Sequence, residues 1–290
     1  MTDIGYYLKL ANGQHWYLQA ESALEEWLSC FAKIMLLPEK TIESGSPVWR
    51  FLIRNSSEKI YSPDYWVTFT SQQVTIHAKS DGSELVTQIA QYDSGLENEK
   101  YLRMMVAIQS LFLSTCPKGG IPVHAALIKH QGSGILISAT GGTGKSTCAQ
   151  RIPYPWKSLC DDSVLLVPVN GRYYAHPLPT WSDFILRNMV HSHWDVKRSL
   201  PVSAVWFLEQ GNEDSTHILM KGEAASRLYQ SAVQMSNYSI IRAENEKQFK
   251  EWHGLMFNYC CDAVSGFSCG VLKATLGGRF WEFLKPPAQG

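Results

Sequence analysis

The residues best suited to chemistry stand in a glycine-rich stretch near the middle of the chain. An apolar run at 134–139 leads into this stretch, and the residues after it favour a helix start. Glycines let backbone N–H groups turn inward around phosphate oxygens, and the first turn of a helix adds the positive end of its dipole. The spacing predicts a phosphate-binding loop made of Thr140, Gly141, Gly142, Thr143, Gly144, Lys145, Ser146 and Thr147.

Two side chains of this loop have distinct expected tasks. The ammonium of Lys145 can reach the β- and γ-phosphates, and the hydroxyl of Ser146 can ligate Mg²⁺. The usual first glycine of such a motif is Ala139 here, so the strict pattern is missed by one methyl group. The alternative is a fortuitous glycine-rich turn, which requires the preceding strand and the Lys-Ser pair to arise by accident. We therefore predict that the loop binds ATP or another nucleoside triphosphate with Mg²⁺.

A pair of aspartates follows the loop and directly precedes a second apolar run at 164–167. Neighbouring residues of a strand face opposite ways, so Asp161 and Asp162 can serve different partners. One carboxylate would face a metal ion and the other an acceptor hydroxyl, which suits phosphoryl transfer. The alternative is an aspartate turn or cap before a strand.

His124 begins an expected strand at 123–129, just before the strand that leads into the loop. A lone histidine on a strand is more often a packed, hydrogen-bonded residue than a functional one. Its position next to the loop strand is what favours a functional interpretation.

Together these three elements resemble the HPr kinase family. The resemblance rests on the run Ile-Pro-Val-His at 121–124, the loop ending Gly-Lys-Ser, and the aspartate pair, in that order. It covers 119–168 well and continues more loosely at 204–211, 223–228 and 278–281. It implies a compact α/β P-loop catalytic domain, with the fold that HPr kinases share with phosphoenolpyruvate carboxykinases. In the HPr kinase family this domain phosphorylates a serine hydroxyl on a protein.

The resemblance also implies roles for individual residues. Lys145 and Ser146 would bind phosphate and Mg²⁺, and His124 would lie close to the transferred phosphoryl group. Asp161 would be the general base and Asp162 the metal ligand, although spacing alone allows the two roles to be exchanged.

The chain also departs from the HPr kinase pattern. No counterpart of that family's glycine-rich signature follows the aspartate pair, so HPr itself is not expected as acceptor. The chain resembles more closely the divergent HPr-kinase-related proteins of peptide-modification cassettes, in particular the SynChlorMet cassette protein C family.

These observations favour a Mg²⁺- and ATP-dependent kinase with a hydroxyl acceptor, such as a Ser or Thr of a peptide or protein, or a small molecule. The alternative is a non-catalytic nucleotide-binding accessory protein of a modification assembly. The aspartate pair favours the kinase, because nucleotide binding alone needs no base. A carboxykinase is disfavoured by the length of the chain and by the lack of a second metal constellation.

The elements that must position these residues fall into two groups on either side of a Pro/Gly cluster at 117–120. Before it, the patterns predict strands at 6–10, 15–19, 48–53, 65–70, 74–78 and 85–91, and helices at 22–35 and 98–113. After it, they predict strands at 123–129, 134–139, 163–169, 172–175, 204–209 and 217–220, a helix at 223–235, and a closing hairpin of 271–276 with 279–283. We expect a smaller N-terminal α+β domain at 1–117 with a recognition role, and the HPr kinase-like domain at 118–290.

Composition excludes several classes of partner. Lys plus Arg equals Asp plus Glu at 26 each, so no basic excess indicates nucleic-acid binding. The most apolar long stretch, 101–116, contains Arg103 and Gln109 and is too short and too polar to span a membrane. No signal peptide is visible in residues 1–13, and the seven cysteines form no CxxC pair, so a cytoplasmic location with reduced thiols is expected. The sequence leaves open whether the chain forms a homo-oligomer.

Overall fold

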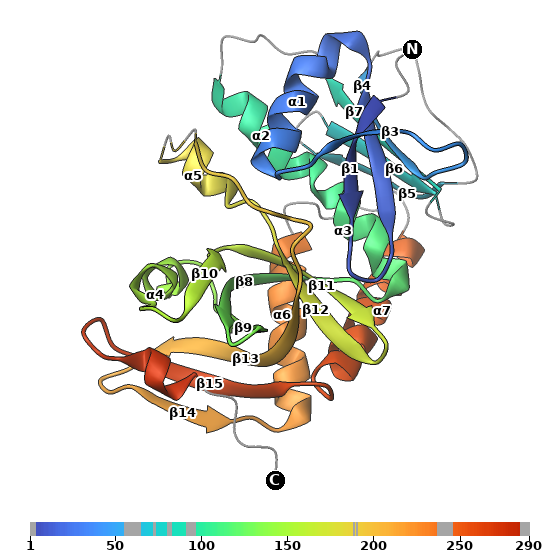
Figure 1. The fold of residues 1–290 in the computed structure, drawn as a ribbon. Helices are drawn as coiled ribbons and strands as arrows, with labels where there is room; N and C mark the ends of the chain where they lie inside the picture. The colour runs from blue at the N-terminus through green and yellow to red at the C-terminus, as the bar shows by residue number, and fades with distance from the viewer. Residues whose placement is uncertain are drawn as a thin grey trace. The chain divides into compact units, whose positions relative to one another are not determined.

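The computed structural model describes residues 4–54, 65–71, 74–79, 83–90, 97–187, 189, 191–236 and 246–284. These form a mixed α/β structure with two sheets (Figure 1). The chain divides into two compact units. The first comprises Met1–Lys118, Pro179–Lys197 and Ser236–Trp252, and the second comprises Gly119–Leu178, Arg198–Met235 and His253–Gly290. Two short segments from the second half of the sequence therefore belong to the first unit.

The first unit contains a seven-stranded sheet in the order β3-β1-β2-β4-β7-β6-β5. β4 pairs in parallel with both β2 and β7, and the other pairs are antiparallel. The strands are β1 (Ile4–Lys9), β2 (His15–Ala20), β3 (Glu39–Thr41), β4 (Val48–Arg54), β5 (Tyr65–Ser71), β6 (Val74–Lys79) and β7 (Glu84–Ala90).

Aromatic side chains fill the core of this first unit. Helix α1 (Glu25–Ile34) has apolar residues at helical spacing, which places Trp27 and Phe31 on one buried face. The Trp27 ring lies 5.4 Å from that of Phe51 on β4. Helix α5 (Trp181–Ile185) adds Trp181, which stacks on Phe31 at 6.0 Å. The remaining short elements are η1 (Ser22–Leu24), α2 (Glu97–Ala107), α3 (Gln109–Thr115) and η2 (Cys116–Lys118).

The second unit contains eight strands, of which β9, β13 and β15 run parallel to one another. Strand β8 changes partners along its length. At His124 it lies opposite Ser163 of β11, and at Ala125 it lies opposite Ser138 of β9. The strands are β8 (Ile121–His130), β9 (Ser133–Ser138), β10 (Lys157–Cys160), β11 (Ser163–Val169), β12 (Arg172–Pro177), β13 (Leu200–Gln210), β14 (Ser215–Ile218) and β15 (Ser268–Ala274).

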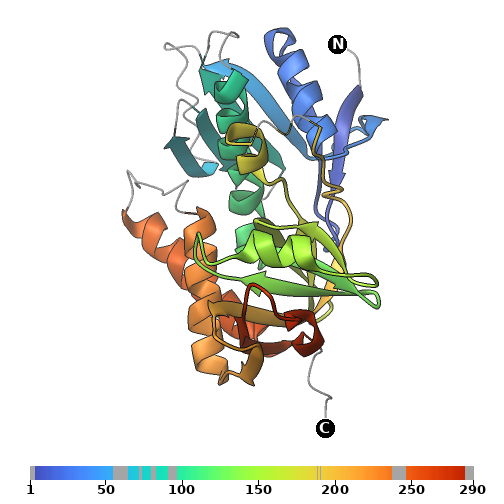
Figure 2. The ribbon, with the colours of Figure 1, turned by 90° about the vertical axis from the view of Figure 1, so that its left-hand side faces the viewer.

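Helices cover both faces of this second sheet. Helix α4 (Lys145–Arg151) and the turn η4 (Phe280–Phe283) share a core with one face, which includes Trp206 of β13. The next residue, Phe207, faces the other way, and the guanidinium of Arg227 on α6 (Lys221–Ser236) lies 5.9 Å from its ring. Figure 2 shows α6 and α7 (Glu246–Ala263) together on one side of the sheet. In the part of the chain described, no helix is both long and apolar enough to cross a membrane.

Most expected elements are present, and two differ. The helix expected at 98–113 is divided into α2 and α3 at Ile108. Strands β3 and β10 and helices α5 and α7 were not predicted. The hairpin arm expected at 279–283 is wrong, because these residues form the 3₁₀ turn η4 and bury Phe280 in the core. The chain turns away from β15 because Arg151 donates hydrogen bonds to the carbonyls of Thr275 and Gly278.

Candidate functional site

The glycine-rich loop connects β9 to α4, and two of its glycines have backbone conformations that other residues avoid. Gly142 has φ of 78° and Gly144 has φ of 113°. Ala139 is not among the described residues with positive φ, so an alanine fits there without backbone strain. The missing first glycine of the motif therefore has no conformational cost.

This loop lies at the carboxyl edge of the three parallel strands. Strands β9, β13 and β15 run in one direction, so the segments that follow them emerge at the same edge of the sheet. The Gln210 side chain at the end of β13 donates to the Thr143 carbonyl of the loop at 3.5 Å. Ligands of α/β sheets bind outside this edge, where backbone groups are not used by the ladder.

Lys145 is buried at the start of α4, and its ammonium has three partners. Nζ donates to the carbonyl oxygens of Ala139 at 2.9 Å and Thr140 at 3.3 Å. It lies 2.7 Å from Nε2 of His124. Burial lowers the pKa of Lys145, and the charges of Asp162 and Asp161 oppose that effect.

His124 links this lysine to the aspartate pair. Its Nδ1 lies 3.0 Å from the backbone oxygen of Asp162 and 3.4 Å from Oδ1 of the same residue. Both partners are acceptors, so Nδ1 carries the hydrogen and Nε2 is free to accept from Lys145. Burial is the main cause that lowers the pKa of His124, and the Lys145 charge lowers it further, while Asp162 raises it. The neutral imidazole is the form that this arrangement requires.

The two aspartates lie in the bend between β10 and β11, and both are half-buried. The Asp162 backbone oxygen accepts from the N–H of Ala125 at 3.1 Å, and its Oδ2 accepts from the Ser163 hydroxyl at 3.2 Å. The charge of Asp161 raises the pKa of both His124 and Lys145, so its carboxylate contributes to the electrostatics of the site. We expected Asp161 and Asp162 to point to opposite faces of a strand. The structure instead has them as neighbours in a bend.

The oxygen donors of the site suit Mg²⁺ better than a metal ion that takes all of its ligands from protein side chains. Across the described residues, no three His, Cys, Asp or Glu side chains are grouped as a metal site. Mg²⁺ keeps several waters and commonly takes one or two protein oxygens together with phosphate oxygens. The hydroxyl of Ser146 in the first turn of α4 and the carboxylate of Asp162 are donors of this kind. Thr147 follows on the exposed side of that turn.

Sequence reasoning missed a pair of serines that hold the backbone of His124. Ser231 Oγ on α6 accepts from the His124 N–H at 3.0 Å, and Ser138 Oγ donates to the His124 carbonyl at 3.0 Å. The two hydroxyls lie 2.9 Å apart. A signal was present, since Ser231 falls three positions after the buried Leu228, and a buried serine needs a partner.

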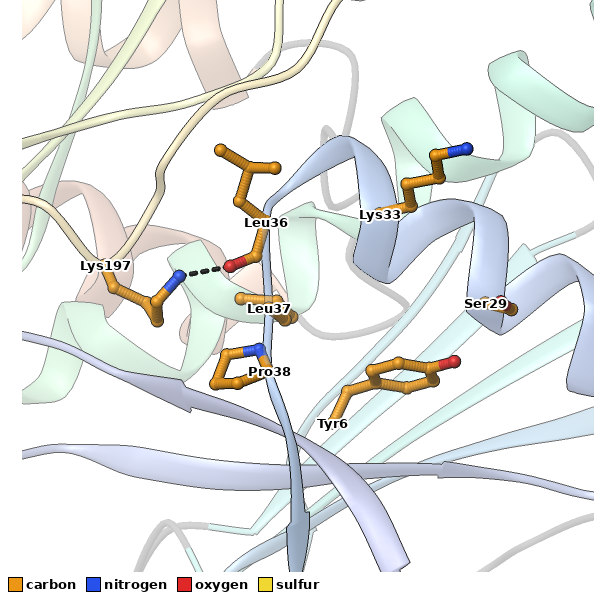
Figure 3. Close-up of a pocket in the computed structure, with 7 residues that line it drawn as sticks. All are labelled: Tyr6, Ser29, Lys33, Leu36, Leu37, Pro38 and Lys197. Carbon is orange, nitrogen blue, oxygen red and sulfur yellow. Dashed lines mark hydrogen bonds between the residues drawn. The ribbon is translucent and has the colours of Figure 1, made fainter.

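A separate hollow of about 410 Å³ lies in the first unit (Figure 3). The ammonium of Lys197 donates to the Leu36 carbonyl at its rim, and Asp195 pairs with the same lysine at 3.1 Å. None of the residues predicted from the sequence as site residues lines this hollow. Its lining consists of Tyr6, Ser29, Lys33, Leu36, Leu37, Pro38 and Lys197.

Comparison with known proteins gives one family and a distant structural similarity. The family model described as SynChlorMet cassette protein ScmC matches residues 88–286. Among solved structures, the HPr(Ser) kinase/phosphatase from Coxiella burnetii is similar at 16% identity, over 34% of this chain and 77% of that chain, with a TM-score of 0.24. No curated protein matches the sequence.

Proposed function

The chain belongs to the SynChlorMet cassette protein ScmC family, and from that premise we propose that it is an ATP- and Mg²⁺-dependent kinase with a hydroxyl acceptor. The acceptor would be a Ser or Thr of a peptide or protein, in keeping with a peptide-modification cassette. The observation that carries the proposal is the 2.7 Å contact between Lys145 Nζ and His124 Nε2, beside Asp162 and at the base of the glycine-rich loop.

The loop supplies the nucleotide site of the proposed P-loop domain. At Gly141 a side chain would meet nothing within 4 Å, and φ is not positive, so neither crowding nor backbone conformation explains a glycine there. Close approach of the backbone to phosphate oxygens would explain it. Two carbonyls hold Lys145 at the same loop, which supports a role for its charge in binding the β- and γ-phosphates.

The two aspartates divide the remaining work in this proposal. Asp161 would accept the proton of the acceptor hydroxyl, the role that the resemblance to HPr kinases implies. Asp162 and Ser146 would hold Mg²⁺, which when bound neutralises the charge on the phosphates. His124 would stay neutral and keep the Lys145 ammonium in place rather than act as a base.

Acceptor recognition is assigned in this proposal to the first unit, with the predicted domain at 1–117 as its main part. The hollow in Figure 3 supports that role, because its lining combines the apolar Leu37 and Pro38 with the polar residues Tyr6, Ser29 and Lys33. A concave, mostly apolar lining with a few polar groups is typical of recognition sites.

Titration calorimetry and ATP turnover test the proposal together. We expect Mg-ATP to bind the intact protein, and Lys145→Ala to raise Kd by at least about tenfold, or about 1.4 kcal/mol. Lys157→Ala, an exposed lysine on β10, is the matched control and should bind normally. An unchanged Kd in folded Lys145→Ala would exclude the nucleotide site.

ATP turnover with candidate acceptor peptides then distinguishes a kinase from a non-catalytic nucleotide-binding accessory protein. A kinase transfers the γ-phosphoryl group to one of them, and mass spectrometry detects the added phosphate. Tight Mg-ATP binding without transfer to any peptide or small hydroxyl compound would favour the accessory protein instead.

A further inference from the structure

His124 is the last residue of β8 that pairs with β11, and pairing with β9 begins at the next residue. β8 pairs with β11 up to His124, with β9 from Ala125, and also with β10 from Leu127. Where strand pairing begins or ends, some backbone N–H and C=O groups have no hydrogen-bond partner in a neighbouring strand. When such groups are buried, they need other partners. For His124 these partners are the hydroxyls of Ser231 and Ser138, described above.

Ser231 is one of three α6 residues spaced four apart, at 227, 231 and 235, so they lie in a row along the helix. Each member of the row contacts a different part of the site. Arg227 Nη1 lies 2.9 Å from Glu209 Oε1 at the carboxyl end of β13. Met235 Sδ lies 3.7 Å from the hydroxyl of Ser163, which in turn donates to Asp162.

Ser231, the central residue of this row, is linked to two of the partners that hold Lys145 in the glycine-rich loop. Ser231 holds the backbone of His124, whose imidazole accepts from Lys145. Its partner Ser138 directly precedes Ala139, whose carbonyl also accepts from Lys145. A shift of α6 would therefore displace two of the three partners of the lysine at once.

We infer that Ser231 is a positioning residue, through which helix α6 fixes His124 and so sets the place of Lys145 in the glycine-rich loop. The consequence for nucleotide affinity rests on the proposed function, whereas the link from Ser231 to the imidazole does not. The charged groups that act on the imidazole are Lys145, Asp161 and Asp162.

The link is tested in nucleotide-free protein by ¹⁵N-histidine NMR at one fixed pH, with the His124 signals assigned by loss in His124→Gln. In Ser231→Ala we expect the Nδ1 and Nε2 chemical shifts of His124 to move, because the ring no longer has a fixed position beside the Lys145 ammonium and the Asp162 oxygens. Ser203→Ala is the matched control. Its hydroxyl donates to the Gly134 carbonyl at the opposite end of β9, and its loss should leave His124 unchanged.

The result that would overturn the inference is a Ser231→Ala protein whose His124 chemical shifts are the same as those in Ser203→Ala. If Ser231→Ala fails to fold, Ser231→Cys serves in its place, since a thiol keeps the volume but bonds weakly, and the same comparison decides. Ser231→Thr keeps the hydroxyl and should restore the wild-type chemical shifts of His124. A change like that of the alanine variant would also overturn the inference.

Calorimetry with Mg-ATP separates this inference from the proposed function. We expect Ser231→Ala to weaken binding by about three- to tenfold, as the loss of one buried hydrogen bond allows. If the wild-type protein binds no Mg-ATP, the proposed function fails while the NMR comparison still decides the role of Ser231. If Mg-ATP binds the wild type and Ser231→Ala equally well, the positioning of Lys145 by α6 is contradicted.

Discussion

At the scale of single residues, the two aspartates have different proposed roles. Asp162 contacts His124 and Ser163 and would hold Mg²⁺, whereas Asp161 would act as the base. These roles are the reason for expecting unequal effects when each is replaced by asparagine, which keeps the shape and removes the negative charge.

Asp161→Asn should leave the Mg-ATP affinity nearly unchanged and slow transfer by about 10²–10⁴-fold, because a positioned base contributes that much. Asp162→Asn should instead raise the Mg²⁺ concentration needed for activity, since a hard cation prefers an anionic oxygen. Single-turnover kinetics over a Mg²⁺ titration measures both effects. Rates within about tenfold of wild type in both variants would make the pair a structural turn only.

His124 contributes to the pH dependence of stability. Its folded pKa lies below the ordinary 6.5, so the unfolded chain binds more protons between these two values. Stability from this group is therefore complete above pH 6.5 and is lost as pH falls through the folded pKa.

We expect the unfolding free energy of the wild type to decrease as pH falls below 6.5, by at most about 1.4 kcal/mol per pH unit for this one group. His124→Gln removes the titrating ring and should flatten that part of the curve. Because the chain has nine histidines, the difference between the two proteins is the quantity to measure, by urea unfolding at several pH values. Parallel curves would show that His124 has its ordinary pKa.

At the scale of elements, the glycine-rich loop contains glycines that are expected for two different reasons, backbone conformation at one position and ligand binding at another. Gly144 has a φ of 113°, where a side chain is strained, whereas Gly141 has an ordinary φ and open space around it. The same substitution should thus affect stability at one position and binding at the other.

Gly144→Ala should lower the unfolding free energy by about 1–3 kcal/mol. Gly141→Ala should keep or slightly raise stability, as the unfolded chain loses freedom, and weaken Mg-ATP binding by at least about tenfold. Gly222→Ala, at an open and exposed position on α6, is the control and should not change binding. Normal Mg-ATP affinity in Gly141→Ala would mean that no phosphate approaches the backbone there.

The β15–η4 connection shows how packing can override local propensity. Residues 279–283 are rich in aromatics and follow a Gly-Gly pair, which favours a hairpin arm. A side chain at Gly278 would collide with the Asp214 carboxylate, and Asp214 also accepts from the Thr275 N–H at 2.7 Å. These contacts hold the connection in a tight turn, and Phe280 gains burial by leaving the sheet edge.

At the scale of the whole molecule, the segment Pro179–Lys197 belongs to the first unit although it follows the site residues in sequence. Trp181 stacks on Phe31, and Phe184 stacks on Tyr101 at 4.8 Å. The Trp194 N–H donates to the carbonyl of Ile34 at 2.8 Å. The division into domains at 1–117 and 118–290 remains a prediction, and these contacts give a reason why a cut there should cost stability.

A fragment of residues 119–290 should expose Trp181, Phe184 and Trp194, each with about 150–250 Å² of surface to bury. We expect it to bind a hydrophobic dye, to associate in sedimentation experiments, and to unfold at lower urea than the full chain. Co-expression with a fragment of residues 1–118 should reverse these effects. A monomeric 119–290 fragment with the unfolding midpoint of the full chain would show that the second part folds without the first.

The sequence by itself determined the features that are local in the chain. The glycines at positive φ, the Lys-Ser pair and the apolar strand before them are set by residue types within one strand, turn and helix start, and the structure contains all of them. The strand at 163–169 was predicted with its observed bounds for the same reason. Membership of the ScmC family likewise confirms the narrower resemblance drawn from the sequence.

Only the tertiary structure decided how these features meet. Lys145 meets His124 across 21 residues of sequence, at the point where β8 stops pairing with β11 and starts pairing with β9, and no local pattern records this meeting. Ser231 reaches the same histidine from 107 residues away. Such contacts are decided by the packing of whole elements, because burial of their apolar faces determines which polar groups are left to pair with one another.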